Sequence, residues 1–191
     1  SGRRVGYPDR TFRERMLDLK KDARFEYILI FKNHGEAAGA SLEHPHSQLI
    51  ATPIVPKRVR EEVDGAKGYY SYKERCVFCD ILVQEEQKGI RLVEARGDYV
   101  ATCPYAPRVP YEVWIMPRVH ESAFEKIALA RPGVRRDLGA LLRRTLTRIR
   151  SLAEAFHLVL HTTPNTLHRS QVLNYWRTID EDYHWHMEIM P

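Results

Sequence analysis

The sequence contains few cysteines and no long run of apolar residues. Its three cysteines are an odd number, which argues against a disulfide framework and favours a reducing compartment. The longest uninterrupted apolar run, Tyr27 to Phe31, has the size of a strand, whereas a membrane span needs about 20 residues. No apolar stretch follows Ser1-Gly2-Arg3-Arg4, so the start does not resemble a secretory signal. We therefore expect a cytoplasmic protein that does not bind a membrane.

The composition is otherwise that of a globular protein with a mildly basic surface. Hydrophobic residues make up 43% of the chain and aromatic residues 10%, which excludes a disordered chain and allows a sizeable core. The 30 basic and 25 acidic residues give a net charge of +5, which suits phosphorylated small molecules as well as nucleic acid. The nine histidines are unusually many. Histidine chemistry is therefore the first place to look for a function.

The hydrophobic pattern predicts short strands and few long helices. Strands are expected, from apolar runs or alternation, at residues 25–31, 49–55, 91–95, 99–103, 112–116, 157–162 and 185–190. Helices are expected at residues 11–21, 80–87 and 134–156. Because these elements do not alternate as βαβ units, the pattern favours an α+β fold with antiparallel sheets. The charged segment 56–72, with its two glycines, is the best candidate for a linker.

The stretch His44-Pro45-His46-Ser47-Gln48 is the most informative part of the sequence. Alternate side chains of an extended segment lie on one face, so His44, His46 and Gln48 project together. An imidazole with one nitrogen held by a hydrogen bond can attack phosphorus, and a nearby amide can donate to a phosphate oxygen. The preceding loop, with Gly39 and Ser41, can hold further phosphate oxygens. The alternative is a surface strand with exposed histidines.

Cys76 and Cys79 form a C-x-x-C pair, which is a usual spacing for two zinc ligands on a tight turn. Two histidines from distant strands would complete a tetrahedral set, and His120 and His184 are our first choice. His161 is the competitor. The alternatives are a redox pair, although no βαβ pattern surrounds it, and two buried reduced cysteines.

Two H-x-H motifs form a faint internal echo. His44-Pro45-His46 and His184-Trp185-His186 each precede an apolar strand that ends near a proline. The alternative is coincidence in a histidine-rich chain.

The segment from Phe31 to Ser41, running into His44-Pro45-His46-Ser47-Gln48, resembles the active-site signature of the galactose-1-phosphate uridylyltransferases, which belong to the histidine-triad superfamily. The resemblance continues in order through the C-x-x-C pair, His120, the His161-Thr162-Thr163-Pro164 run and the second H-x-H motif. It implies a duplicated α+β fold of antiparallel sheets with flanking helices, a homodimer and a reaction in two displacements. Residues 1–65 would be the C-terminal portion of the first half, and residues 66–191 the second half with its zinc site.

Carried over by position, the resemblance implies a role for each motif residue. His46 would be the nucleophile that becomes nucleotidylated, and Gln48 would bind the transferred phosphoryl group. Asn33 and Ser41 would hold phosphate oxygens. Two further positions correspond to metal ligands of family members, namely His44 and, in some members, Glu62. The zinc site found in the second half of a subset of the family would consist of Cys76, Cys79, His120 and His184.

The sequence also departs from the family pattern. Full members are longer, and their N-terminal C-x-x-C, base-contacting segment and hexose-phosphate-binding tail have no counterpart here. We therefore expect a portion of a longer protein that is weakly active or inactive by itself. His186 occupies the position of a second nucleophile, but Met187-Glu188 replaces Ser-Gln. The second half is accordingly interpreted as structural.

The function that these observations favour is a nucleotidyltransferase that moves UMP, or another NMP, between sugar 1-phosphates. Its partners would be a nucleotide sugar and a sugar 1-phosphate, and not nucleic acid. The alternatives are a nucleotide-sugar phosphorylase like ADP-glucose phosphorylase, a histidine-triad hydrolase and a zinc-stabilised nucleic-acid-binding module. The arginines of segment 134–156 motivate the last, but they spread around the helix without interleaved aromatic residues.

Overall fold

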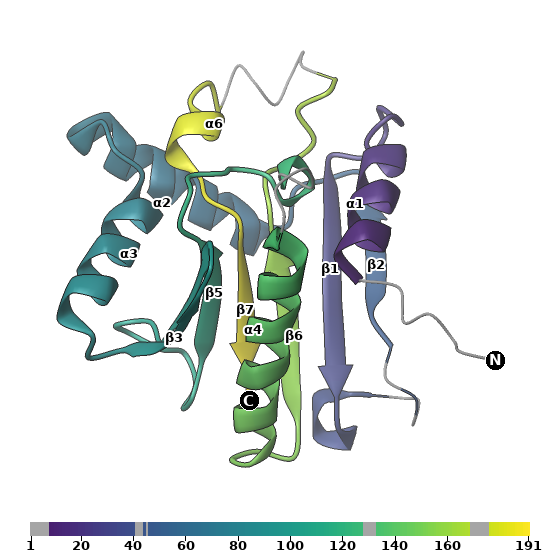
Figure 1. Ribbon diagram of the computed structural model, residues 1–191. Coiled ribbons are helices and arrows are strands. Elements are labelled where there is room, and N and C mark those ends of the chain that lie inside the picture. Colours follow the sequence, from purple (N-terminus) through teal and green to yellow (C-terminus); the bar gives the residue numbers. More distant parts are fainter. Residues whose placement is uncertain (1–7, 41–43, 45, 128–132, 169–175) are drawn as a thin grey trace.

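A computed structural model describes residues 8–40, 44, 46–127, 133–168 and 176–191 (Figure 1). Its centre is a seven-stranded sheet with the order β2-β1-β6-β7-β5-β4-β3, in which every neighbouring pair is antiparallel. Helices cover both faces of the sheet. The fold is therefore α+β, as the sequence predicted.

The strands are β1 (Tyr27–His34), β2 (Gln48–Thr52), β3 (Leu92–Arg96), β4 (Tyr99–Thr102), β5 (Val113–Pro117), β6 (Phe156–His161) and β7 (His186–Met190). The α-helices are α1 (Pro8–Leu19), α2 (Lys57–Lys73), α3 (Val77–Lys88), α4 (Val134–Arg150) and α6 (Ile179–Asp182). Two short 3-10 helices are η1 (Glu36–Ala38) and η2 (Phe124–Lys126). In the part of the chain described here, no helix combines the length and apolar character that crossing a bilayer requires.

The segment that was expected to be a linker is helix α2, so that prediction was wrong. Val59, Val63 and Ala66 recur at helical spacing and are buried. The abundant charges on the remaining positions obscured this narrow stripe in the sequence. Gly65 and Gly68 face open space on the outer side of the helix, where they are tolerated. The division into residues 1–65 and 66–191 stays a prediction, and strands from both segments share one sheet.

Helix α4 is shorter than predicted. It ends at Arg150, and the chain then turns so that Phe156 begins β6, antiparallel to β1. The amides of Ser151 and Leu152 bond back to Arg148 and Ile149, which closes the last turn. The apolar pattern continues across this turn because Phe156 belongs to the same core from a strand.

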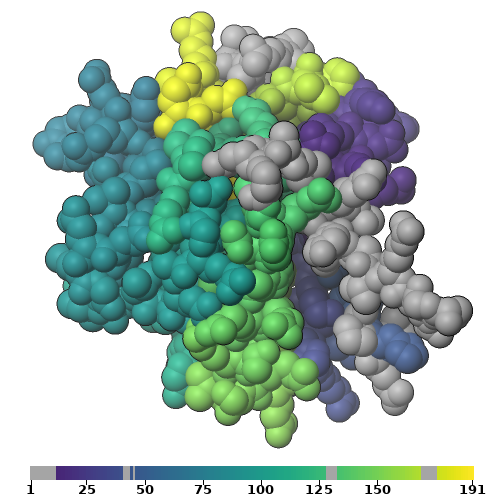
Figure 2. All heavy atoms as spheres, in the orientation of Figure 1, coloured from purple at the N-terminus to yellow at the C-terminus, as the bar shows by residue number. Residues whose placement is uncertain are grey.

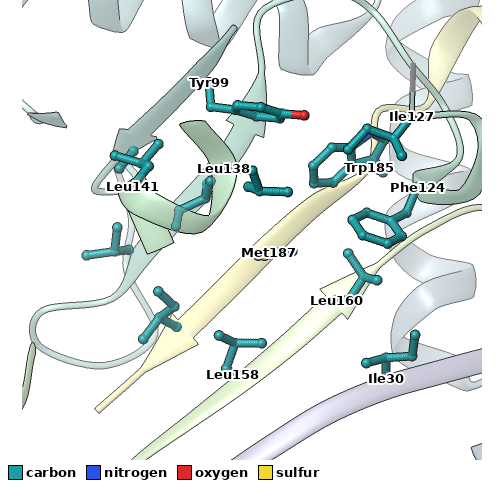
Figure 3. Packing of buried hydrophobic residues seen from close by; sticks show 14 of the residues in the cluster. Ile30, Tyr99, Phe124, Ile127, Leu138, Leu141, Leu158, Leu160, Trp185 and Met187 are labelled. Atoms are coloured by element: carbon teal, nitrogen blue, oxygen red, sulfur yellow. The ribbon is translucent and has the colours of Figure 1, made fainter. Parts of the chain in front are cut away.

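The main hydrophobic core lies between the sheet and α4. Leu138 and Leu141 of α4 pack over strand residues such as Ile30, Leu160 and Met187 (Figure 3). The outer side of α4 reaches the surface at the front of the molecule (Figure 2).

A second core lies on the other face of the sheet, under α2 and α3. Tyr27 and Leu29 of β1 contribute to it. Because side chains alternate along a strand, Phe31 and Asn33 point to this second face as well.

The turn after β1 depends on Gly35, which has a φ of +83°. A Cβ at this position would lie 2.7 Å from the Glu154 carbonyl oxygen and 2.8 Å from the Ala155 Cβ. We expect Gly35→Ala to lower the free energy of unfolding by about 1–3 kcal/mol, because both the backbone conformation and the contact oppose a side chain. Urea denaturation measures the change.

Gly139→Ala is the matched control, since a Cβ there meets nothing within 4 Å on helix α4. Alanine in an exposed helical position is expected to stabilise the protein by up to about 1 kcal/mol. A loss of stability of the same size in both variants would contradict this account of the turn.

Candidate functional site

The ring of His46 is held by the backbone just before strand β2. Its Nδ1 lies 3.0 Å from the carbonyl oxygen of His44. A carbonyl oxygen only accepts hydrogen bonds, so Nδ1 carries the proton and Nε2 keeps the lone pair. The hydrogen bond that was expected to hold one ring nitrogen is therefore present, and its acceptor is the His44 carbonyl oxygen. Lys32 Nζ donates to the His46 carbonyl oxygen at 3.1 Å, which fixes the backbone of the same residue.

The sheet brings three of the predicted phosphate-site residues to one region. Gln48 pairs with Phe31 across β2 and β1, so Gln48 and Asn33 lie on the same face. Gly39 ends η1 in the left-handed conformation, with a φ of +73°. A Cβ at Gly39 would lie 4.0 Å from Asn33 Nδ2, so the amide of Asn33 faces this turn. Ser41, the fourth predicted residue, lies outside the described residues.

His157, which was not among the predicted site residues, belongs to this region as well. It is the cross-strand partner of Asn33 on β6, and its Nδ1 lies 3.0 Å from Asn33 Oδ1. A histidine at the second position of an apolar strand was the available signal. Nothing in the sequence indicates that this strand pairs with β1.

The four predicted ligands of the zinc site come together. The potential ligand atoms of Cys76, Cys79, His120 and His184 all lie within 4.8 Å of one another. The first two residues open helix α3, while His120 follows β5 and His184 precedes β7. His161 does not join this group. His44 is exposed and, among the described residues, joins no candidate ligand group, so its assignment as a ligand stays a prediction.

Both histidines of this group are oriented by the backbone. Their Nδ1 atoms lie 3.3 Å and 3.5 Å from Cys79 Sγ, for His120 and His184 respectively. Their Nε2 atoms lie 2.8 Å from the Asp180 carbonyl and 2.9 Å from the Pro117 carbonyl. Such outer hydrogen bonds fix the tautomer that leaves Nδ1 available as a ligand. The histidine rings are therefore set as metal ligands usually are.

The pKa values of the two cysteines are shifted by their contact with each other. A hydrogen bond from Cys79 lowers the pKa of the Cys76 thiol to about 3, against the opposing effect of burial, and the same bond raises the pKa of Cys79. Two cysteine sulfurs, which bind metals as thiolates, and two imidazole nitrogens are a donor set that fits a tetrahedral divalent metal.

A second group of potential ligands consists of Glu62, His161 and His186. Glu62 Oε2 lies 2.7 Å from His161 Nδ1, and Glu62 Oε1 lies 3.2 Å from His186 Nε2. Glu188 Oε2 lies 3.1 Å from His161 Nε2. Burial alone would lower the pKa of His161, but its hydrogen bonds to Glu188 and Glu62 raise it to about 10. The group is an ion-pair network in this structure.

The two H-x-H motifs share one local geometry. His186 Nδ1 lies 3.1 Å from the His184 carbonyl oxygen, just as His46 Nδ1 bonds to His44. The surroundings differ, because His186 is 1% exposed and its Nε2 faces Glu62, whereas His46 is partly exposed. This burial supports the interpretation that the second motif is structural.

Comparisons with known proteins find relatives that align with most of the chain. A family model described as "Domain of unknown function (DUF4931) N-terminal domain" matches residues 11–54. The chain is 31% identical to an ADP-glucose phosphorylase of Arabidopsis thaliana over 183 residues, which cover 95% of this chain and 48% of that protein. It is 38% identical to a galactose-1-phosphate uridylyltransferase of Thermotoga maritima over 109 residues, which cover 57% of this chain and 34% of that protein.

The fold agrees as well. A crystal structure of an ADP-glucose phosphorylase from Arabidopsis thaliana with bound ADP-glucose superposes with a TM-score of 0.82 at 28% identity, and the match covers 98% of this chain and 56% of that chain. The chain spans about half the length, or less, of the curated relatives it matches. The shared fold and the sequence identity, over 95% of this chain for one relative, show that the chain belongs to the galactose-1-phosphate uridylyltransferase family of the histidine-triad superfamily.

Proposed function

We propose that the protein transfers a nucleotidyl group from a nucleotide sugar to a phosphate-bearing acceptor through a covalent intermediate on His46. The observation that carries this proposal is the hydrogen bond from His46 Nδ1 to the His44 carbonyl, which leaves Nε2 as the free nucleophile. Asn33 and Gly39, two of the residues predicted to hold phosphate oxygens, lie close to each other. The similarity to uridylyltransferases and to an ADP-glucose phosphorylase supports the same chemistry.

The reaction has two displacements. In the first, His46 Nε2 forms a bond to the α-phosphorus while the bond from this phosphorus to the bridging oxygen breaks, and the sugar 1-phosphate leaves. In the second, an oxygen of the acceptor phosphate attacks the same phosphorus and His46 leaves. Amide donors from Gln48 and Asn33 would stabilise the charge on the non-bridging oxygens in both steps.

Two acceptors are compatible with this mechanism, and we propose a sugar 1-phosphate as the first. Inorganic phosphate is the second, because the relative that aligns with 95% of the chain is an ADP-glucose phosphorylase. Both acceptors use the same first displacement. A homodimer in the complete protein is part of the same proposal.

The arginine side of helix α4 gives little support to a nucleic-acid-binding module. Arg144 Nε lies 2.8 Å from Glu94 Oε1, and Arg148 Nη1 lies 2.7 Å from Glu94 Oε2. A phosphate backbone would have to compete with this carboxylate for both guanidinium groups. A solvated, ion-paired helix surface is the simpler interpretation.

For the metal group, we propose that Cys76, Cys79, His120 and His184 bind a structural zinc ion. Bound zinc would tie the start of α3 to the segments that flank β5 and β7, and it would contribute folding free energy. Four side-chain ligands would complete a tetrahedral set, so no coordination position would be left open for a substrate.

We expect about one zinc ion per chain that depends on this group. Cys79→Ser should lose the metal and lower the melting temperature, because structural zinc binding is coupled to folding. Metal analysis by mass spectrometry together with thermal unfolding, with and without a chelator, measures both effects. His161→Gln is the control that should keep the zinc, and full zinc occupancy in the Cys79 variant would refute the assignment.

His46→Gly should abolish nucleotidylation and leave the fold and the zinc unchanged. Gln48→Ala should slow both displacements by about 10²-fold, the usual cost of one lost transition-state donor. The measurement is the protein-bound radiolabel after denaturation, with ADP-glucose and UDP-hexoses labelled in the α-phosphate as donors. The adduct should be labile in acid and stable in base, and the complete protein should show ping-pong kinetics.

His168→Gly is the matched control, since His168 is exposed and bonds only to the Lys21 carbonyl among the described residues. It should label as the wild type does. Peptide mapping that places the adduct on another residue would contradict the mechanism.

A further inference from the structure

The side-chain amide of Asn33 is held at one end only. Its Oδ1 lies 3.0 Å from His157 Nδ1, across a pairing of β1 and β6 that joins residues 124 positions apart. Among the residues that the structure describes, its Nδ2 makes no hydrogen bond. This free end lies 4.0 Å from the Cβ position of Gly39, at the turn that leads toward His44 and His46.

The orientation of this amide decides whether Asn33 attracts or repels a phosphate. The two ends of a carboxamide have nearly the same shape but opposite roles, since the nitrogen donates and the oxygen only accepts. An oxygen turned toward an anionic phosphate would be repulsive, whereas the two N–H groups would stabilise it. A partner that binds the oxygen therefore also selects the productive orientation.

From this geometry we propose that His157 is a positioning residue for nucleotidyl transfer. It donates from Nδ1 to Asn33 Oδ1 and thereby directs Asn33 Nδ2 toward the phosphate of the bound nucleotide. The inference rests on the proposed function, because it explains how the Asn33 amide is oriented in the same site. His157 itself does not touch the reacting atoms in this assignment.

A purely structural role predicts something different. Cross-strand pairs stabilise a sheet by their contact, so any truncation of His157 would weaken the pairing of β1 with β6 without a selective effect on chemistry. A positioning role requires a donor at one particular atom. Asparagine carries its amide nitrogen at the same number of bonds from Cα as Nδ1 of histidine, while glutamine carries it one bond further away.

The experiment measures single-turnover labelling of His46 at saturating nucleotide sugar in the complete protein. His157→Ala and His157→Gln should each slow labelling about tenfold, the scale of one neutral hydrogen bond. His157→Asn should restore most of the rate. The apparent affinity for the nucleotide sugar should change less than the maximal rate, because the amide donates most strongly to the transition state. Equal rates in all three variants and the wild type would overturn the inference.

A double-mutant cycle tests whether His157 acts through Asn33. If it does, His157→Ala should have no further effect in an Asn33→Ala background. Additive losses would show that His157 acts elsewhere and would overturn the proposal. Thermal unfolding of each variant separates these effects from a loss of folded protein.

A spectroscopic readout separates this inference from the proposed function. Long-range proton–nitrogen NMR spectra of the wild-type protein should show His157 protonated on Nδ1, and Asn33→Ala should remove that preference. A His157 ring that carries its proton on Nε2 would overturn the inference even if His46 is labelled normally. Absence of any adduct in the wild type would instead refute the proposed function, and the inference with it.

Discussion

The antiparallel pairing of β1 with β6 is the constraint on which the rest of the structure depends. It joins a strand near the start of the chain to one that follows α4, and it places Asn33 opposite His157. Because β2 pairs with the other edge of β1, the same register carries Gln48 into this neighbourhood. A shift of one residue would turn each of these side chains to the opposite face and bury them in the core under α4. Gly35 supports the register by allowing the end of β1 to approach residues 154 and 155.

The two faces of the sheet differ in composition: one packs an apolar core, and the other carries polar residues of the candidate sites. The face under α4 is almost entirely apolar, and its buried leucines and aromatic residues form one continuous core. The opposite face carries Asn33, His161 and Glu188 on the three neighbouring strands β1, β6 and β7. Buried charges on this face are matched in pairs, as between Glu62 and His161, because an unpaired ion in such a place is strongly destabilising.

The repeated H-x-H motif shows how one local geometry serves different purposes. In both copies the Nδ1 of the second histidine donates to the carbonyl oxygen of the first, so its Nε2 is directed toward other elements. The Nε2 of His186 lies beside the carboxylate of Glu62. His46 is partly exposed, just before the edge strand β2. The ring orientation comes from the backbone of the motif, whereas the chemical role comes from the residues that other elements bring to it.

The sequence by itself determined the class of fold, most of the elements and the motifs of both sites. Apolar periodicity is a local property, so the strands, the hairpin of β3 and β4 and the start of α4 could be predicted from it. The order of Cys76, Cys79, His120 and His184 likewise identified a ligand group that the structure brings together. Helix α2 was missed because its buried stripe is narrow and its other positions are charged.

Only the tertiary structure decided which distant residues meet. It separated His161 from the cysteines and placed it beside Glu62, and it set His157 against Asn33. No local pattern contains this information, because strand order and register are fixed by the packing of the whole sheet between its two helical layers. The sequence therefore determined what chemistry is present, and the long-range pairing of strands decided where it is assembled.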